Sequence, residues 1–505
     1  MGQAQNWLTM MENKTLTFLS KTKYIAGLQC PKLLWVYYNA KQEIPEITES
    51  QQAIFDQGHL VNEFARRLFP GGSEVPGRTE FDRILKETQK LLPRRPILFE
   101  PAFQYKTAYA RPDVLKPNKD GSWDIYEVKS SGGAKNIYYL DIAFQKYCYE
   151  GAGLKIRRSH IVHINTDYVR RGEIDPEALF TVVDVTKEIQ GTAEEIEKNI
   201  ARMLDIIDKR SRPEIKIGKQ CSHPYECPLT DACWEHIPED SVFILNRIRS
   251  DKAFGFINEG FIKATDVPQE RLTTLTHQIV SKCHKEKKAH VDQKAIKGLL
   301  KQLEFPLYFI DFETVGAAVP LYEGSRPFQQ VPFQFSLHVW DGWDKKPVHH
   351  AFLAEGRGDP RPEFLKKLRS LIGPKGTVLA YNVDFERRCL KESAEEYPEY
   401  QEWFKDVDSR FVDLMVPFRR FDYYDPKQMG RYSIKSVYPA LTGGSYKEME
   451  ISDGGQASGE YERVTFTDGV SEKEKRRIYD GLLEYCKLDT QAMIDILKVL
   501  QKSTC

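Results

Sequence analysis

The order of apolar and polar positions divides the chain into two segments of mixed strands and helices, separated by a stretch with helical spacing. In the first segment, residues 15–240, apolar runs predict strands at 96–103, 108–115 and 123–129. Apolar residues at intervals of three and four then predict helices at 137–149 and 192–208. We therefore expect a mixed α/β fold for this segment.

Residues 241–303 have a different pattern. Their apolar residues recur at helical spacing and strand patterns are hard to find, so we predict a helical connector. Four lysines cluster there: Lys282, Lys285, Lys287 and Lys288. A solvated helix face is the simpler explanation of this cluster, and contact with phosphates is the alternative.

From residue 304 to 505 the strand pattern returns. The predicted strands are 307–312, 334–340 and 377–381. The predicted helices are 362–371, 385–393 and 473–500. The stretch 451–469 is polar and rich in glycine, which predicts a loop or hairpin insertion.

Composition sets limits on the class of protein. A chain of 505 residues is too long for one ordinary core, so two or three domains are expected. The 73 basic and 73 acidic residues give a net charge of zero, which neither supports nor excludes binding to nucleic acid. Nine cysteines, an odd number spread over a long chain, argue against a disulfide framework.

Nothing in the sequence indicates a membrane protein. No apolar run is long enough to cross a bilayer, and the first twenty residues lack the apolar core of a signal peptide. The residues ahead of Met11 could be a vector remnant or an upstream start. We expect a cytoplasmic protein with no membrane partner.

A first set of charged residues lies in the N-terminal segment. Asp113 is near the end of one predicted strand, and Glu127 and Lys129 lie in the next, where their spacing puts both on one face. Two carboxylates can hold Mg²⁺, and a nearby lysine can orient or deprotonate the attacking water. Gln145 and Tyr149 follow, one helical turn apart. Charged residues on a solvated strand face are the common alternative for any one of these positions.

This ordered series resembles the PD-(D/E)xK nucleases of the RecB type. The resemblance implies a restriction-endonuclease-like domain with Asp113 and Glu127 as metal ligands. It implies catalytic roles for the remaining three: Lys129, Gln145 and Tyr149.

One position departs from that family pattern. Such nucleases often carry a histidine four residues after a glycine, whereas Gly58 is followed at that spacing by Asn62. His59 directly follows the glycine and is a candidate substitute. Lowered or lost activity at this site is therefore an open alternative.

Four cysteines flank the same segment: Cys30, Cys221, Cys227 and Cys233. Their spacing alone leaves an iron–sulfur cluster, zinc or no site open. One cysteine before the core and three after it resembles the iron–sulfur RecB-family nucleases, including the nuclease of CRISPR spacer acquisition. That resemblance implies a structural [4Fe–4S] cluster. The other cysteines are expected to be ordinary thiols: Cys148, Cys283, Cys389, Cys486 and Cys505.

A second set of acids lies in the C-terminal segment. Asp311 and Glu313 end an apolar strand and project together, because successive side chains of a strand alternate between faces. Tyr485 and Asp489 are four apart in a helical pattern and also share a face. Between them lies the series from Asn382 to Glu386. Acids gathered in this way can hold two divalent metal ions.

In order, these pieces resemble the three motifs of the DEDD exonucleases, in the variant with a tyrosine in the third motif, on a ribonuclease H-like fold. The resemblance implies Mg²⁺ or Mn²⁺ on four acids, Tyr485 orienting water, and removal of nucleotides from a 3′ end. The four acids are Asp311, Glu313, Glu386 and Asp489. The chain as a whole resembles a bacterial family that joins the two nuclease types.

The second motif departs from the usual pattern because its acid is Glu386 rather than aspartate. Asp384, two positions earlier, is the second choice for the ligand. Asp413 could add to the site, although a cap or a supporting role suits it better. Lys435 and Ser433 could contact phosphate, or could simply lie on the surface.

Taken together, these patterns predict a metal-dependent nuclease that processes DNA in repair, mobile-element biology or defence, through one RecB-like site and one 3′–5′ exonuclease site. One alternative is a ribonuclease that acts on RNA ends. Another is a nucleic-acid-binding protein in which one nuclease site is inactive. The sequence does not indicate protein partners.

Overall fold

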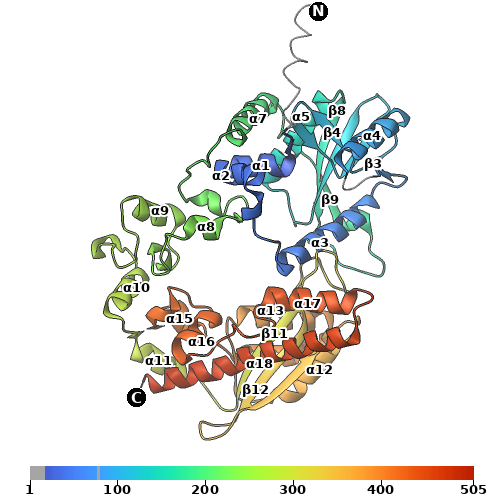
Figure 1. Cartoon of the computed structure of the whole chain (residues 1–505). Coiled ribbons are helices and arrows are strands. Elements are labelled where there is room, and N and C mark those ends of the chain that lie inside the picture. Colours follow the sequence, from blue (N-terminus) through green and yellow to red (C-terminus); the bar gives the residue numbers. More distant parts are fainter. Residues whose placement is uncertain (1–16, 77–79, 505) are drawn as a thin grey trace, which may run out of the picture. The chain divides into compact units, whose positions relative to one another are not determined.

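The computed structural model describes residues 17–76 and 80–504, which form two compact units (Figure 1). The first unit takes in Ile54–Tyr168 and Glu173–Trp234 together with the chain before Thr48. The second holds the chain from Glu235 onward and two short segments, Thr48–Ala53 and Val169–Gly172. The residues ahead of Met11 lie outside the described ranges. No helix within those ranges is both long and apolar enough to cross a membrane.

The first unit is built on a mixed six-stranded sheet in which β7 and β8 pair in parallel. Its strand order is β2 (Ser73–Glu74), β3 (Leu98–Phe99), β6 (Val114–Pro117), β7 (Trp123–Lys129), β8 (Ile156–Ile164) and β9 (Phe180–Asp184). Strand β7 is buried along nearly its whole length, as expected for a strand covered on both faces. It matches the predicted strand and carries Glu127 and Lys129.

Two of the strands predicted for this unit are each divided in two. The predicted strand 96–103 becomes β3 and β4 (Phe103–Tyr105), with Glu100 between them in a left-handed conformation at φ 52°. The predicted strand 108–115 becomes β5 (Ala108–Ala110) and β6, interrupted at Pro112, which has no N–H for a ladder. Strands β4 and β5 join β1 (Leu19–Ser20) in a small separate sheet. Asp113 therefore lies in the break ahead of β6, not near the end of a long strand.

The helices of the first unit are α1 (Lys21–Gln29), α2 (Pro31–Asn39), most of α3 (Glu49–Arg66), α4 (Phe81–Leu91), α5 (Asn136–Gly151), α6 (Pro176–Leu179), α7 (Ala193–Ile207) and α8 (Thr230–Trp234). Helices α5 and α7 match the predicted helices within two residues at each end. Phe144 of α5 stacks on Tyr24 of α1 with ring centroids 4.6 Å apart, which ties α1 to the core.

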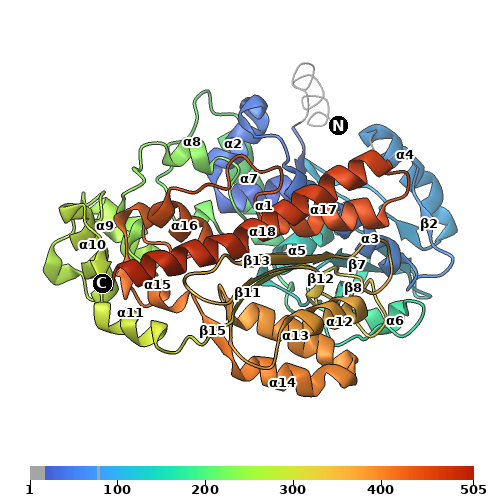
Figure 2. The same ribbon diagram turned by 90° about the horizontal axis from the view of Figure 1, so that it is seen from below.

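The second unit is built on a five-stranded sheet ordered β13 (Val348–Leu353), β12 (Val331–Trp340), β11 (Leu307–Val315), β14 (Thr377–Ala380) and β15 (Phe411–Asp413). Strands β11 to β13 are antiparallel, and β14 and β15 run parallel to β11. One face carries α12 (Arg361–Leu371), α13 (Asp384–Glu396) and α14 (Gln401–Ser409), whereas α16 (Ile434–Thr442) and α18 (Glu472–Lys502) lie on the other (Figure 2).

The segment predicted as a loop or hairpin at 451–469 is mostly a helix, α17 (Gly454–Phe466). Its first turn is capped by Asp453, whose side chain accepts a hydrogen bond from the Gln456 N–H. Its buried side includes Ala457, Tyr461 and Val464, which recur at helical spacing despite the glycines around them. The prediction was wrong because three apolar residues were outweighed by a polar, glycine-rich composition.

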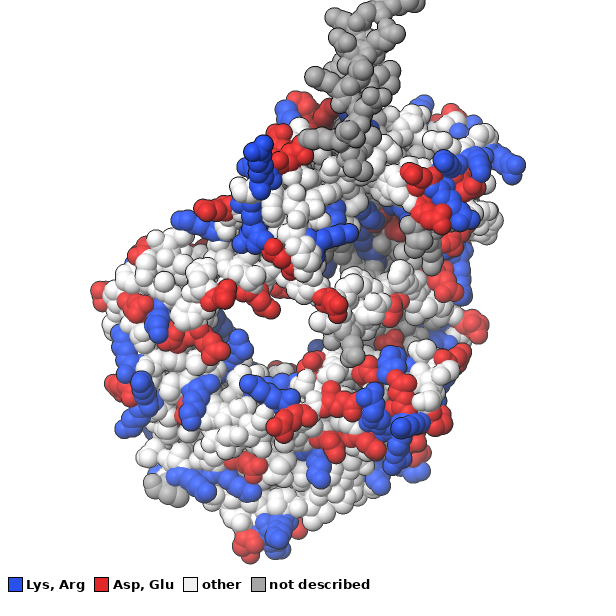
Figure 3. Space-filling view, viewed as in Figure 1, with Lys and Arg blue, Asp and Glu red and all other residues white. Residues whose placement is uncertain are grey.

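The predicted connector is helical and contains α9 (Ser250–Asn258), α10 (Leu275–Glu286) and α11 (Gln293–Leu300). A short strand, β10 (His290–Val291), pairs with β16 (Tyr423–Tyr424), and this part of the chain groups with the second unit. The four clustered lysines are all exposed, as a solvated face requires. Basic and acidic side chains are interspersed over the visible surface, in keeping with 73 of each (Figure 3).

Candidate active sites and a four-cysteine pocket

Asp311 and Glu313 lie on the face of β11 that is turned toward α18. Leu307 and Phe309 point the same way and pack against Met493 and Leu497 of α18. The alternate residues Tyr308, Ile310 and Phe312 pack toward α12 and α13 instead. The two-residue period of the strand thus directs both acids to the helix that carries Tyr485 and Asp489.

A cavity of about 510 Å³ opens where β11, α13, α16, α17 and α18 meet. All four predicted acids line it: Asp311, Glu313, Glu386 and Asp489. Glu313, Glu386 and Asp489 are each at most 6% exposed. Segments that are far apart in the sequence therefore bring four carboxylates into one buried space.

Burial and mutual repulsion disfavour the ionised forms of these acids. Burial and the nearby Asp489 raise the pKa of Asp311 well above its usual range. Burial, reinforced by Asp311, does the same to the pKa of Glu313 and of Glu386. Burial also raises the pKa of Asp489 to about 6.

The donor set fits hard divalent cations. The second carboxylate oxygen of Glu386, Oε2, is buried and has no hydrogen-bond partner among the described residues. A buried carboxylate oxygen in that state is unfavourable unless a cation or a water satisfies it. Oxygen-only coordination by several carboxylates is what Mg²⁺ and Mn²⁺ prefer.

Tyr485 and Lys435 also line this cavity, and Tyr446 contacts one of its acids. Tyr485 lines it, as predicted, and Tyr446, which the sequence did not reveal, donates from its hydroxyl to Asp489 Oδ1 at 2.7 Å. Lys435 also lines the cavity, and its Nζ donates to the Ser452 carbonyl at 2.6 Å. The same Nζ lies 5.0 Å from the centre of the Tyr485 ring. Lys435 is therefore part of the site rather than a remote surface residue.

Cys486 lies beside the acids but outside the lining of the cavity. Its Sγ, Asp311 and Glu313 each offer an atom within 4.8 Å of the others, and Sγ lies 3.4 Å from Asp311 Oδ2. The residue is fully buried and does not line the cavity. Burial and the Asp311 charge raise the pKa of this thiol well above its usual value, so it acts as a donor that orients Asp311.

The structure distinguishes the three acids considered for the second motif. Glu386 faces the cavity, whereas Asp384 is exposed and pairs with Arg387 at 3.2 Å. Asp413 accepts hydrogen bonds from the Asn382 N–H at 3.1 Å and the Met415 N–H at 2.9 Å. Asn382 adopts a left-handed φ of 76°, a conformation that asparagine tolerates. Asp413 thus holds the turn that begins α13 and presents Glu386.

The N-terminal set forms a continuous hydrogen-bonded chain in the first unit. Lys129 Nζ donates to Glu127 Oε1 at 2.8 Å, and Gln145 Nε2 donates to Glu127 Oε2 at 2.8 Å. The Tyr149 hydroxyl donates to Gln145 Oε1 at 2.8 Å. Asp113 Oδ2 accepts the Val128 N–H at 2.7 Å, which brings it beside β7. All five predicted residues therefore meet.

Two charged residues that the sequence did not single out belong to this set. Asp141, on the same helix as Gln145, accepts from Lys129 Nζ at 2.6 Å and from Gln145 Nε2 at 3.0 Å. Lys21, at the start of α1, donates to Glu127 Oε1 at 2.5 Å. Lys21 is more than a hundred positions from Glu127, so no local pattern could have revealed the contact.

At the position where such nucleases often carry a histidine, Asn62 rather than His59 lies beside Asp113. Its Nδ2 lies 3.4 Å from Asp113 Oδ1, whereas His59 is exposed on α3. An asparagine can offer a metal its carbonyl oxygen but cannot reproduce an imidazole nitrogen.

The charges in this set are largely balanced. Burial opposes ionisation of Glu127, but Lys129 and Lys21 outweigh it and hold the pKa of that carboxyl below its usual range. Burial and the Glu127 charge raise the pKa of Asp113 to about 7. Although burial opposes it, Glu127 and Asp141 raise the pKa of Lys129 well above its usual value, which favours the charged form of this lysine.

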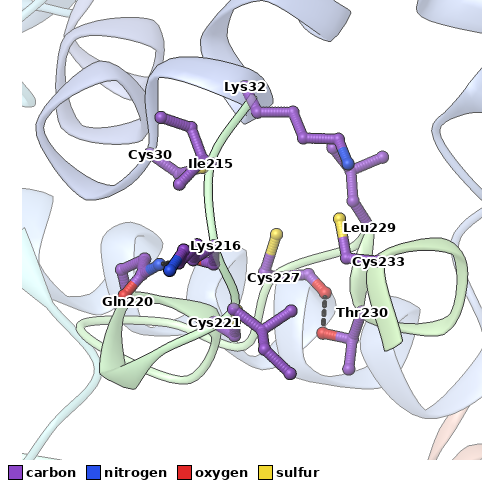
Figure 4. A pocket seen from close by; sticks show the side chains of 11 residues that line it. Cys30, Lys32, Ile215, Lys216, Gln220, Cys221, Cys227, Leu229, Thr230 and Cys233 are labelled. Atoms are coloured by element: carbon purple, nitrogen blue, oxygen red, sulfur yellow. Dashed lines mark hydrogen bonds between the residues drawn. The ribbon is translucent and has the colours of Figure 1, made fainter. Parts of the chain in front are cut away.

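The four predicted cysteines line one small pocket of the first unit (Figure 4). Cys227 and Cys233 direct their sulfur atoms into the same space, with Cys30 across from them (Figure 4). Gln29, next to Cys30, donates from Nε2 to the carbonyls of Gln220 at 2.8 Å and Tyr225 at 2.7 Å. Hydrogen bonds between protein groups therefore already connect the segment that carries Cys30 with the segment that carries the other three cysteines.

The four thiols could bind zinc or an iron–sulfur cluster, and their sulfur atoms are not all gathered as a zinc ion would require. Four thiolates around Zn²⁺ would lie about 3.8 Å apart, given Zn–S bonds of about 2.3 Å. Among the described residues, three ligand atoms within 4.8 Å of one another are found at Asp311, Glu313 and Cys486, and not among these cysteines. Burial raises the pKa of Cys30, while the backbone N–H groups of Leu33 and Lys32 favour its thiolate.

Comparison with known proteins gives a family match but no activity. The family model "Domain of unknown function (DUF2779)" matches residues 308–433, from β11 to the turn before α16. That range holds three of the four cavity acids: Asp311, Glu313 and Glu386. It ends before α18, which carries Asp489.

Two curated relatives are similar over part of the chain. "Uncharacterized protein UU173" of Ureaplasma parvum is 25% identical over 46% of this chain and 36% of its own length. "Uncharacterized protein MG366 homolog" of Mycoplasma pneumoniae is 27% identical over 49% of this chain and 40% of its own length. The match thus spans about two fifths of either relative. A solved structure, "Crystal structure of SSO0001", aligns at a TM-score of 0.23 and 11% identity over 46% of this chain and 92% of its own, a likeness too slight to identify a fold.

Proposed function

We propose that the chain is a metal-dependent nuclease whose second unit removes nucleotides from the 3′ end of a nucleic-acid strand, with DNA favoured over RNA. One observation carries the proposal: three separate segments bring four carboxylates, three of them buried, around one cavity, and Glu386 Oε2 there has no partner among the described residues. Buried acids without counter-charge are unfavourable for folding alone, so their persistence favours a role in binding cations.

The strand order and the three motifs support a ribonuclease H-like exonuclease domain of the DEDD type. In this account the four cavity acids would hold two Mg²⁺ or Mn²⁺ ions. Bound there, such ions lower the pKa of a water and stabilise charge on a leaving oxygen. Tyr485 would align the water, and Lys435, the basic side chain lining the cavity, would attract the phosphate.

The first unit would be a second nuclease centre of the RecB type. Asp113 and Glu127 would hold a divalent ion there, and Lys129 would orient the attacking water. Gln145 and Tyr149 would fix Glu127 through the hydrogen bonds described above. The four-cysteine pocket would hold a [4Fe–4S] cluster that ties the two ends of the unit together.

The test is hydrolysis of labelled single-stranded DNA and RNA with Mn²⁺ by matched variants. Asp311→Ala should abolish release of nucleotides from the 3′ end, whereas Asp384→Ala, an exposed acid at the start of α13, should retain it. Glu127→Ala should remove any cleavage that remains in Asp311→Ala. Activity in Asp311→Ala equal to wild type would overturn the assignment of the second unit.

A second function is favoured by one observation in the first unit. Every oxygen of Glu127 already accepts hydrogen bonds, and an asparagine occupies the usual histidine position. A unit in which this site is inactive would serve to bind nucleic acid for the exonuclease. Unchanged DNA cleavage but altered DNA affinity in Glu127→Ala would favour this reading.

A further inference from the structure

The N-terminal site already contains its own cations. Glu127 Oε1 accepts from two ammonium groups, Lys21 at 2.5 Å and Lys129 at 2.8 Å, and Oε2 accepts from Gln145 at 2.8 Å. The Glu127 side chain is 2% exposed, so these three donors replace water around it. A divalent ion that used Glu127 as a ligand would have to displace at least one of them.

The two candidate sites differ in how their charge is balanced. The cavity of the second unit has four acids and is lined by one lysine, Lys435. The first unit gathers three acids around two lysines: Asp113, Glu127 and Asp141 around Lys21 and Lys129. Positive charge supplied by the chain lowers the attraction of a site for a metal ion, because opposite charges nearby are already paired.

Lys21 is the more easily displaced of the two lysines. Lys129 Nζ is held by two short contacts, to Glu127 at 2.8 Å and to Asp141 at 2.6 Å. Lys21 Nζ has one short contact, to Glu127, while its distance to Asp141 is 4.0 Å. Its side chain is 30% exposed against 17% for Lys129, so the ammonium of Lys21 can move to water at lower cost.

The backbone of Lys21 is fixed even though its ammonium can move. Leu19 and Ser20 form β1, which pairs with β5, and Ser20 caps α1 by accepting the Lys23 N–H at 3.4 Å. Helix α1 then runs to Cys30, which caps α2 and lines the cysteine pocket. The base of the Lys21 side chain is therefore held beside Glu127 by both a strand and a helix.

From this arrangement we propose that Lys21 is a built-in competitor of the divalent ion at Glu127, so that it sets the metal affinity of the N-terminal site. The inference rests on the proposed function, in which Asp113 and Glu127 bind a metal. It predicts two metal sites of unequal affinity: the second unit binds Mn²⁺ first, and the first unit binds it only at a higher concentration. Lys21 is a specificity-determining residue in this role, not a catalytic one.

The test measures Mn²⁺ binding to the full-length chain by calorimetry and by electron paramagnetic resonance. The background is Asp311→Asn with Asp489→Asn, which removes ligands of the second site. Lys21→Met keeps the apolar stem without the charge and should bind Mn²⁺ at least tenfold more tightly at the N-terminal site. Lys21→Arg keeps the charge and should not bind more tightly than the background. Lys23→Met, which removes a lysine lying 3.3 Å from the Tyr37 ring centre, is the matched control and should leave the affinity unchanged.

A second readout separates binding from folding. Without metal, Lys21→Met should melt at a lower temperature than the background, because Glu127 loses a counter-ion, and Mn²⁺ should raise its melting temperature by more than it raises that of the background. Lys21→Gln gives the same comparison if the methionine variant does not fold.

The outcomes distinguish the inference from the proposed function. Unchanged or weaker Mn²⁺ binding in Lys21→Met, with binding abolished by Glu127→Gln, would overturn the role of Lys21 and leave the metal site standing. Failure of every variant to bind Mn²⁺ in this background would overturn the metal site itself, and the inference with it.

Discussion

Individual contacts give the strongest tests of the proposed metal cavity. Asp489 is held from one side by Tyr446, whose hydroxyl donates to Oδ1 at 2.7 Å. A residue that orients a ligand typically affects metal affinity or activity by about 10- to 100-fold when removed. Tyr446→Phe should therefore lower Mn²⁺ affinity of the second site by about tenfold with little loss of stability. Titration of Mn²⁺ into both proteins measures the effect.

The matched control is Tyr438→Phe, whose ring lies 6.0 Å from that of Tyr446. The control should bind Mn²⁺ like wild type. Equal affinities in all three proteins would show that Tyr446 does not orient a metal ligand.

A buried histidine predicts how stability changes with pH. Burial, with His349 nearby, lowers the pKa of His338 to about 3, and its Nδ1 lies 2.8 Å from Thr490 Oγ1. An unfolded histidine titrates near 6.5, so below that pH the unfolded chain binds a proton at this residue that the folded chain does not bind. His338 should therefore contribute a loss of stability as the pH drops below about 6.5, of about 2 kcal/mol at pH 5. The buried acids whose pKa is raised, such as Asp311 and Asp113, act in the opposite direction, so the contribution of His338 is isolated by comparing a variant with wild type.

His338→Asn removes the titrating group and leaves an amide near Thr490. Urea unfolding of the metal-free protein at pH 7.5 and pH 5 gives the change in unfolding free energy between the two pH values. This change should be more favourable to the folded state at pH 5 in the variant than in wild type, by about 2 kcal/mol. An identical change in both proteins would mean that His338 does not contribute to the pH dependence.

Among the secondary-structure elements, α17 is the one where the structure differs most from the sequence-based prediction of a loop or hairpin. Tyr461 is fully buried and stacks on Phe333 with ring centroids 3.6 Å apart. Truncating a buried aromatic residue costs about 3–5 kcal/mol, whereas a surface loop tolerates the change within about 0.5 kcal/mol. Tyr461→Ala should therefore strongly lower the free energy of unfolding of the second unit.

Tyr461→Phe is the conservative partner of that variant. Tyr461→Phe keeps the buried ring and removes only a hydroxyl that lies near Tyr322 and Thr465, so it should cost far less stability than Tyr461→Ala. Chemical denaturation of both variants tests the pair. A neutral Tyr461→Ala would restore the loop interpretation of residues 451–469.

Regular elements with a clear apolar period could be predicted from the sequence. Strands β7 and β11 and helices α5 and α18 lie where the pattern placed them, because their burial repeats within the element itself. The acids carried by these elements were found for the same reason. Contacts such as Lys21 with Glu127 and Tyr446 with Asp489 depend on tertiary packing between distant segments. The spacing of apolar residues within one element cannot predict such contacts.

At the scale of the whole molecule, the two units should respond separately to loss of the cysteine site. Cys227 lines the pocket, and its N–H donates to the Cys221 carbonyl at 2.9 Å. A metal site formed only on folding contributes to folding free energy, so Cys227→Ser should destabilise the first unit. The exonuclease activity proposed for the second unit should be retained.

Calorimetry, iron and sulfide analysis and the absorbance near ~400 nm of protein purified without air would measure these effects. Wild type should contain iron and sulfide, and Cys227→Ser should lack both and show one lowered melting transition. Stoichiometric zinc without sulfide in wild type would contradict the cluster assignment.

The most direct measurement is a time course on single-stranded DNA labelled at its 5′ end, with Mn²⁺, comparing wild type with Asp311→Ala and Asp384→Ala. Wild type and Asp384→Ala should both give a ladder of labelled products that shortens from the 3′ end. The ladder should be absent in Asp311→Ala. No shortening by wild type on either DNA or RNA, or an unchanged ladder in Asp311→Ala, would contradict the claim that the four cavity carboxylates form an exonuclease site.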